Sequence, residues 1–218
     1  MMLPDVSVIV TCYNYGRFLE RCLRSLLNQE HVSRFSYEIV LVDDGSDDNT
    51  PLVVNKFTPL FENLKYVRNA KNQGLPNSCN IGITNSIGRY VVRVDADDWI
   101  NRHFLFMLKF ALDKNRGFQA FCCDYFEVDS LENNIRQVSW MEEEIACAIM
   151  YRKECLEDVG LYNESFQYRE GHELKKRFLK QYQIGYLPIP LYHVRKHNNN
   201  RSNNEAVKEF DNKLTDLE

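Results

Sequence analysis

The sequence lacks several features that would assign a protein class at once. No apolar run approaches the roughly 20 residues that a membrane-spanning helix requires. The N-terminus shows neither the basic segment nor the cleavage signal of a secreted precursor. With a net charge of −4, the chain has no excess of positive charge for general nucleic-acid binding or a polybasic membrane anchor. We therefore expect a cytoplasmic protein that binds no nucleic acid.

The seven cysteines lack a pattern as well. Their number is odd and no pair has the C-x-x-C spacing, so neither a disulfide framework nor a zinc site is expected. We expect reduced thiols that pack as small core residues.

The chain also has no internal repeat and no linker. Its length fits one domain at residues 1–200, with a nucleotide-binding half at about 1–99, an acceptor half at about 100–200, and a polar tail at 201–218.

What the chain does contain is a regular alternation of apolar and amphipathic segments in its first half. Strands are expected at residues 6–10, 38–42, 64–67 and 90–94, and helices at 18–27, after residue 50 and at 75–86. Strand and helix in alternation predict an α/β fold with a mostly parallel sheet flanked by helices. Ligands of such sheets bind beyond the carboxyl ends of the strands.

The second half gives a less regular pattern. Helices are expected at residues 102–114, at 142–159 with an interruption or cap near Met150 and Tyr151, and at about 171–182, and strands are expected at 120–128 and 135–140. The segments 184–190 and 191–195 are expected to be extended, and their prolines suit a sheet edge. From Lys196 onward the chain is polar and rich in Asn, so its last residues are expected to be mobile or weakly helical.

Polar clusters follow three of the expected strands, at residues 11–14, 43–46 and 95–98. One site assembled from all three is the simplest interpretation. The last cluster places Asp95, Asp97 and Asp98 within four residues, and carboxylates that close repel one another unless a cation neutralises them. Mg²⁺ and Mn²⁺ prefer such oxygen ligands and often add substrate phosphates. The alternative is a solvated acidic turn in which Asp98 caps the next helix.

In their order and spacing, these segments resemble family 2 glycosyltransferases, which have the GT-A fold. The resemblance extends from Val6 to about His197 and rests on Val8–Asn14, Ile39–Ser46, Asn72–Leu75, Asn80–Gly82, Gly88–Tyr90, Val94–Trp99 and Leu191–His197. It implies a single Rossmann-like sheet. It also implies inverting transfer of a sugar from a nucleotide diphosphate donor, usually a UDP-sugar, to an acceptor hydroxyl, with Mn²⁺ or Mg²⁺ as cofactor. The family's commonest setting is bacterial cell-surface polysaccharide or glycolipid synthesis, so a saccharide or lipid-linked saccharide acceptor is expected.

The resemblance also implies roles for individual residues. Asp97, supported by Asp95, is expected to hold the metal that stabilises the departing diphosphate. His197 lies where relatives direct a basic residue toward the diphosphate, and it is a further metal-site candidate. Asp44 is favoured over Asp43 for the nucleotide base, although the residues alone leave the two open, because neighbours on a strand point to opposite faces. The other nucleotide-binding candidates, besides Asp95, are Thr11, Tyr13, Asn14, Asn72, Gly74 and Ala96.

One departure from the family pattern concerns a missing positive charge. Cys79 stands where many relatives carry arginine in the helix after Gly74. Arg68, Lys71 and Arg93 are candidates to supply that charge, although each is more often a surface residue. A basic stretch at residues 175–180 offers peripheral membrane contact at the inner face of the membrane, but a solvated basic helix face is the simpler expectation. The oligomeric state stays open.

The second departure concerns the general base. Relatives usually show a Glu-Asp pair whose Asp is the base, whereas the matching positions here are Glu170 and Gly171. The base has therefore moved or been lost. Glu170 and Glu173 are the candidate catalytic residues, and we favour Glu170 because a loop carboxylate one residue earlier can reach the same point. Loss of the base would leave a catalytically inactive nucleotide-sugar-binding protein, which is the alternative function.

Overall fold

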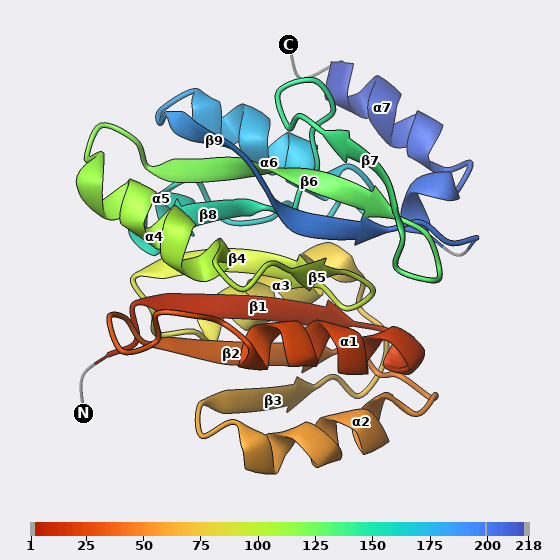
Figure 1. Cartoon of the computed structure of the whole chain (residues 1–218). Helices are drawn as coiled ribbons and strands as arrows, with labels where there is room; N and C mark the ends of the chain where they lie inside the picture. Colours follow the sequence, from red (N-terminus) through yellow and green to blue (C-terminus); the bar gives the residue numbers. More distant parts are fainter. Residues whose placement is uncertain (1–2, 199, 216–218) are drawn as a thin grey trace.

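The computed structural model describes residues 3–198 and 200–215. The strands are β1 (Val6–Cys12), β2 (Tyr37–Asp43), β3 (Leu64–Arg68), β4 (Tyr90–Asp95), β5 (Trp99–Ile100), β6 (Ala120–Val128), β7 (Asn134–Val138), β8 (Ile149–Arg152) and β9 (Ile184–Arg195). The helices are α1 (Gly16–Leu27), α2 (Thr50–Phe57), α3 (Leu75–Thr84), α4 (Phe104–Lys114), α5 (Lys153–Asp158), α6 (Glu170–Leu179) and α7 (Val207–Thr215), with 3-10 turns η1 (Thr58–Leu60) and η2 (Arg201–Asn203). All of the strands belong to one sheet (Figure 1).

The sheet has the order β3-β2-β1-β4-β8-β6-β9-β5, and β7 pairs with β6 off this path. Strand β1 pairs in parallel with both β2 and β4, and β2 pairs in parallel with β3. Strands β6 and β9 are parallel to each other, whereas β8 is antiparallel to both β4 and β6. The predicted α/β fold with a mostly parallel sheet is confirmed.

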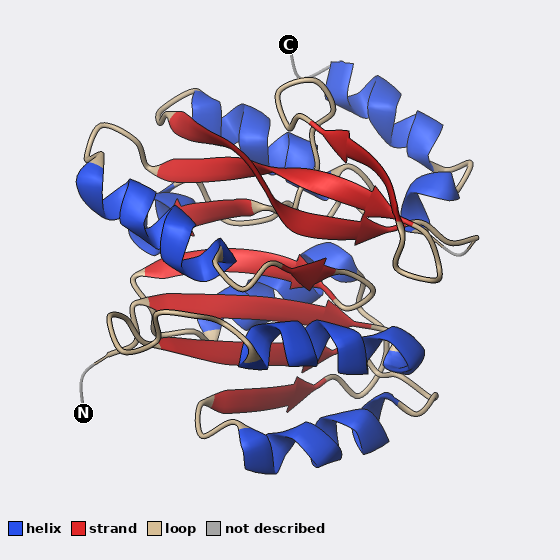
Figure 2. Ribbon diagram, in the orientation of Figure 1, coloured by secondary structure: helices blue, strands red, loops and turns tan. Residues whose placement is uncertain are grey.

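Helices cover both faces of the sheet, which explains the continuous apolar runs of its strands. Strand β1 is buried along its whole length. Because side chains alternate along a strand, Val8 and Val10 pack into one hydrophobic cluster with α1, α2 and α4. Ile9 packs into the other with α3, α5 and α6. These two layers lie in front of and behind the sheet in Figure 2.

The elements expected in the first half are confirmed, as are the helix at about 102–114 and the strands at 120–128 and 135–140. The helix expected at residues 142–159, with its interruption near Met150 and Tyr151, is only partly confirmed, because residues 142–148 are not helical and only α5 follows the interruption. That stretch holds β8 and the short α5, and Ala148 just before β8 has a left-handed φ of 61° that ends any helix. All four residues of β8 are buried between β4 and β6, so neighbouring strands override the local helical pattern.

The segments 184–190 and 191–195 form one strand, β9, and residues 184–190 pair only with β6 among the described strands, so this proline-bearing part lies at a sheet edge as expected. Strand β9 lies between β6 and β5, and Pro188 and Pro190 fall where its register with β6 is interrupted. Prolines are tolerated at such irregularities because a ladder bond is already missing there. In the expected tail, Val207–Thr215 forms α7, which packs Phe210 and Leu214 against Phe166. The division of the chain into two functional halves stays a prediction.

All seven cysteines are buried and free, as expected for core thiols. Burial raises the pKa of several of them, including that of Cys79 to about 12, so they are packed as neutral thiols. Across residues 3–198 and 200–215, none of the helices is both long enough and apolar enough to span a bilayer.

Candidate active site

A cavity of about 500 Å³ lies at the carboxyl ends of β1, β2 and β4, where parallel sheets bind ligands. The N-terminus of α6 and residues after β9 complete its walls. Most of the predicted site residues line this one cavity: Thr11, Tyr13, Asp44, Asn72, Gly74, Asp95, Ala96, Asp97 and Glu170. Four predicted residues are absent from its lining: Asn14, Asp43, Glu173 and His197.

The adjacent carboxylates at the end of β2 have different surroundings. Asp43 is fully buried and turned away from the cavity, where it accepts hydrogen bonds from the Ser46 amide at 2.8 Å and the Tyr66 hydroxyl at 2.7 Å. Asp44 lines the cavity and accepts from the amides of Gln73 and Gly74, both at 2.9 Å. The residues alone left the two open and the family resemblance favoured Asp44, and of the two only Asp44 lines the cavity.

Asn14 shapes the cavity rim without lining it. Its φ of 57° is left-handed, a conformation that Asn tolerates better than most residues. Its amide donates to the Ser46 hydroxyl, and its side-chain oxygen accepts from the Asp47 amide, both at 3.0 Å. Asn14 therefore ties the end of β1 to the loop after β2, which leaves the neighbouring Tyr13 44% exposed at the cavity wall.

Gly74 joins the first half of the cavity to the second. It precedes α3 with a φ of 91°, which few other residues adopt. A Cβ at this position would lie 2.2 Å from Oε1 of Gln167, a residue of the loop before α6. The side chain of Asn72 supports the turn by accepting from the Gly74 amide at 3.1 Å. The left-handed backbone therefore favours glycine here, and a side chain at this position would displace the end of Gln167.

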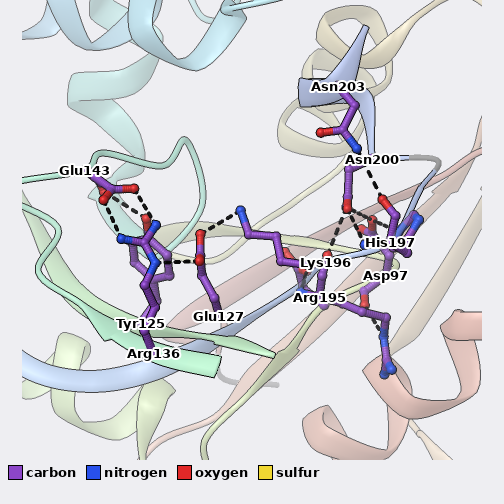
Figure 3. Close-up of polar contacts among 11 residues, drawn as sticks. Asp97, Tyr125, Glu127, Arg136, Glu143, Arg195, Lys196, His197, Asn200 and Asn203 are labelled. Carbon is purple, nitrogen blue, oxygen red and sulfur yellow. Dashed lines mark hydrogen bonds and ion pairs between the residues drawn. The ribbon is translucent and has the colours of Figure 1, made fainter. Parts of the chain in front are cut away.

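Asp97 is held by two residues that follow β9. Its carboxylate lies 2.9 Å from Nε2 of His197 and 3.4 Å from Nδ2 of Asn200 (Figure 3). The His197 ring packs against Phe18 and Tyr15, with ring centroids 4.7 Å and 5.7 Å away. His197 therefore orients Asp97 and is itself fixed by aromatic neighbours.

Arg93 is a buried cation between two carboxylates of the cavity. It binds Asp95 through Nε at 2.6 Å and Nη2 at 3.0 Å, and it binds Glu170 through Nη1 at 2.8 Å. Burial alone would raise the pKa of Asp95, but the charge and hydrogen bonds of Arg93 outweigh it and hold that pKa below its usual value. Of the three candidates for the missing charge, Arg93 is the buried one that contacts site residues. Arg68 binds Asp43, and Lys71 is exposed.

The carboxylate cluster has the chemistry of a divalent-metal site. Asp98 is buried and accepts from the Tyr192 hydroxyl and the Arg195 amide, both at 2.9 Å. Burial, followed by the negative charges of Asp97 and Asp95, raises its pKa well above the usual value. A divalent cation bound to these oxygens would relieve that repulsion, so the residues fit Mg²⁺ or Mn²⁺.

The start of α6 separates the two candidate bases. Glu170 is the first residue of the helix and lines the cavity. Glu173 is buried outside the cavity in an ion pair with Arg177, at 2.6 Å between Oε1 and Nε. A Cβ at Gly171 would lie 2.2 Å from the Cβ of Ala146, so this backbone has no room for a side chain at that position.

Several cavity residues were not predicted from the sequence. They lie before α6, in its first turn and after β9: Gln167, Tyr168, Arg169, His172, Asn200 and Arg201. Arg169 has a left-handed φ of 59° and binds Asp211 of α7 at 2.6 Å, while Arg201 stacks over the Tyr168 ring. Burial, with a smaller effect of Arg169, lowers the pKa of His172. No local motif marks these residues, because packing of α7 against the loop brings them together.

Comparison with known proteins identifies the family. The sequence pattern of the family described as "Glycosyl transferase family 2" matches residues 7–186. The chain belongs to this family. Its curated relatives include the glycosyltransferase GlyA of Streptococcus pneumoniae serotype 4, which is 35% identical over 106 residues, or 48% of this chain and 15% of GlyA. EpsH of Bacillus subtilis is 28% identical over 231 residues, covering 90% of this chain and 62% of EpsH. The family 2 chain thus spans less than two thirds of these relatives.

Solved structures show the same fold. TarS of S. aureus, residues 1–349 in complex with UDP-GlcNAc, superposes with a TM-score of 0.82 at 23% identity, covering 98% of this chain and 65% of that one. The mannosyltransferase PcManGT of Pyrobaculum calidifontis, in complex with GDP-Man and Mn²⁺, gives a TM-score of 0.71 at 19% identity, with 91% and 59% covered. The predicted GT-A fold is confirmed.

Proposed function

We propose that this chain is a metal-dependent, inverting glycosyltransferase that moves a sugar from a nucleotide diphosphate donor, a UDP-sugar, to an acceptor hydroxyl. The observation that carries the proposal is the presence of Asp44, Asp97 and Glu170 on the walls of one cavity. The UDP-GlcNAc of TarS and the GDP-Man and Mn²⁺ of PcManGT support a nucleotide sugar and a divalent metal. We place the reaction in cytoplasmic synthesis of a bacterial cell-surface polysaccharide or glycolipid, with a saccharide or lipid-linked saccharide acceptor.

On the donor side of the cavity, the proposed role of the residues is to bind and orient the nucleotide sugar. An ionised carboxylate offers about four lone-pair sites, and Asp44 uses three of them on Asn69, Gln73 and Gly74. The remaining site accepts the ring N–H of the nucleotide base in this proposal. Asp97 and Asp95 hold the metal, whose chemistry when bound is Lewis-acid stabilisation of the leaving diphosphate.

On the acceptor side, Glu170 is the proposed general base. Arg93 holds its Oε1, while Oε2 makes no hydrogen bond to any residue that the structure describes. As the acceptor oxygen bonds to the anomeric carbon and the bond to the diphosphate breaks, Oε2 takes the hydroxyl proton. Because Arg93 binds both Glu170 and Asp95, it fixes the orientation of the Glu170 carboxylate relative to Asp95.

The second candidate function is a nucleotide-sugar-binding protein without turnover. It is favoured by Gly171, which stands at the position where the family pattern has its base, and by Ala146, which fills the space of a side chain there. In this alternative the donor side is unchanged, and Glu170 serves only as the partner of Arg93. Both functions predict donor binding, and they differ in whether a sugar is transferred.

Release of nucleotide diphosphate distinguishes the two. The protein is incubated with a panel of UDP-, GDP- and dTDP-sugars, Mn²⁺ and a mixed acceptor set, with chelator-treated protein as the control. Release that depends on both acceptor and metal supports the transferase. Calorimetric binding of a nucleotide sugar without release under any condition supports the binding protein. Absence of both binding and release contradicts both.

A further inference from the structure

Three possible metal ligands lie together away from the cavity. Glu30 and His31 follow the end of α1, and His103 immediately precedes α4. One ligand atom from each of the three residues lies within 4.8 Å of the other two. None of the three lines the cavity. The group combines two imidazoles with one carboxylate, a set that the proposed transferase reaction does not use.

The backbone holds these residues close to one another. The Glu30 amide donates to the carbonyl of Arg102 at 2.8 Å. Gln29 bonds the same two segments through its side chain, donating to the Asn101 carbonyl at 2.9 Å and accepting from the Leu105 amide at 3.2 Å. The loop after α1 is therefore fixed to the start of α4, and the proximity of the three ligands does not depend on flexible side chains alone.

The two oxygens of Glu30 have different partners. Oε1 accepts from Nη1 of Arg102 at 2.9 Å, and Oε2 lies 3.6 Å from Nδ1 of His103. A tetrahedral zinc ion with bonds of about 2.0–2.1 Å separates its ligand atoms by roughly 3.4 Å. Oε2 and Nδ1 already stand at nearly that spacing. Arg102 on the other oxygen orients the carboxylate, as outer-shell partners of metal ligands do.

His31 supplies the third ligand from an unusual backbone conformation. Its φ is 63°, a left-handed value that is uncommon for residues other than glycine. The imidazole ring packs on Phe106, with centroids 4.4 Å apart, and lies 5.7 Å from the ring of His103. The side chains of Glu30 and His103 are 42% and 40% exposed, so solvent can supply a fourth ligand.

We propose that Glu30, His31 and His103 form a second metal site, which binds a transition metal of the zinc class. Imidazole favours Zn²⁺, Cu²⁺ and Ni²⁺, whereas carboxylates and phosphates favour Mg²⁺ and Mn²⁺. The two sites of this protein thus select different metals. Because the ligands come from two segments, bound metal crosslinks the loop after α1 to α4 and stabilises the folded chain.

The test is calorimetric titration of Zn²⁺ into chelator-stripped protein with excess Mg²⁺ and no nucleotide sugar. The variants are Glu30→Gln, His31→Asn, which tolerates the left-handed backbone, and His103→Gln. The matched control is Glu20→Gln, because Glu20 is also 42% exposed and pairs with an arginine, Arg24, at 2.7 Å. We expect each ligand variant to weaken Zn²⁺ binding by about tenfold or more, because loss of even an outer-shell partner of a metal ligand costs about 10–100-fold in affinity, and we expect the control to match the wild type.

Visible absorption of Co²⁺-loaded protein provides a second readout that does not depend on catalysis. A tetrahedral-type spectrum in the wild type that is lost in His31→Asn and His103→Gln supports the site. Thermal melts in chelator check that each variant is folded, and added Zn²⁺ should raise the melting temperature of the wild type and the control only. Zn²⁺ affinity that is unchanged in all three ligand variants, or no Zn²⁺ binding by the wild type, overturns the proposal.

Discussion

The two sides of the cavity differ in how the chain builds them. The first side comes from the ends of β1, β2 and β4, which neighbour one another in a parallel sheet. The second side comes from the loop before α6, the first turn of α6 and the segment after β9, which are distant in sequence and meet through tertiary contacts such as the hydrogen bond from Arg201 to the Gln167 carbonyl. Asp44 on the first side is held by hydrogen bonds from the loop before α3, whereas Glu170 on the second is held by Arg93 of β4.

This difference explains where the chain departs from its family. At the strand ends, most of the acidic and polar residues expected of a donor site line the cavity, with Asn14 and Asp43 as the exceptions. At α6 the usual position of the base is Gly171, packed against Ala146, and the nearest cavity carboxylate is one residue earlier. Both proposed functions therefore assign nucleotide-sugar binding to the first side. They differ only in whether the second side supplies a general base for sugar transfer.

The largest expected effect is on the first side. Asp97→Asn keeps the size of the side chain but removes a charged metal ligand. We expect turnover to fall to near background and Mn²⁺-dependent binding of nucleotide diphosphate to weaken. Rates are measured by diphosphate release, and affinity by calorimetry with and without chelator. Near-normal turnover in Asp97→Asn, or equal wild-type rates in excess chelator, would show that the metal assignment is wrong.

The next largest effect tests the second side. Glu170→Gln should lower kcat by about 10²–10⁴, the usual contribution of a general base, while donor affinity stays within a few-fold. Glu173→Gln is the matched control, since Glu173 is a buried carboxylate of the same helix that pairs with Arg177 outside the cavity. It should lower stability and leave kcat nearly unchanged in the folded protein. The reverse pattern would move the base by three residues.

A smaller effect is expected for nucleotide binding. Asp44→Ala removes a charged acceptor and should raise the Kd for UDP about tenfold or more, since a hydrogen bond to a charged group contributes ~1.5–3 kcal/mol. Asp43→Asn is the comparison, because Asp43 is buried outside the cavity lining and bonds to Ser46 and Tyr66, so the change should affect stability more than affinity. Calorimetry with UDP separates them. An unchanged Kd for Asp44→Ala with a large loss for Asp43→Asn would exchange their roles.

The smallest effect concerns acid stability near β9. Burial, with a smaller effect of Arg21, lowers the pKa of His193 to about 4. In the unfolded chain this pKa is about 6.5, so the stabilisation from the neutral ring is complete above that pH and is lost as pH falls toward 4. His193→Phe keeps an aromatic ring beside Trp99, on which His193 stacks with centroids 5.1 Å apart. When the pH is lowered from about 7 to about 4.5, the free energy of unfolding should fall less in the variant than in the wild type. Urea titrations at both pH values measure this, and an equal fall in the free energy of unfolding for wild type and variant would contradict the prediction.

The sequence predicted the first half of the fold well because its signals are local. Each strand is an apolar run that ends in polar residues, and parallel strands place those ends at one edge. That logic located Asp44, Asp95 and Asp97 in one cavity. It failed for β8, since residues 149–152 form a strand only because β4 and β6 flank them. It also left open whether the last residues are mobile or weakly helical, and α7 forms there with its apolar side chains packed against Phe166.

By itself, then, the sequence determined the family, the α/β sheet and the acidic cluster, because these depend on residue order and on periodicities within single elements. Tertiary structure added that, of the pairs which the residues by themselves left open, Asp44 and Glu170 line the cavity whereas Asp43 and Glu173 do not. It also revealed that Arg93, whose residue type suggests a surface charge, is a buried link between Asp95 and Glu170. The physical reason is that the direction of a side chain and the partner of a buried charge depend on elements distant in the sequence, which no local pattern records.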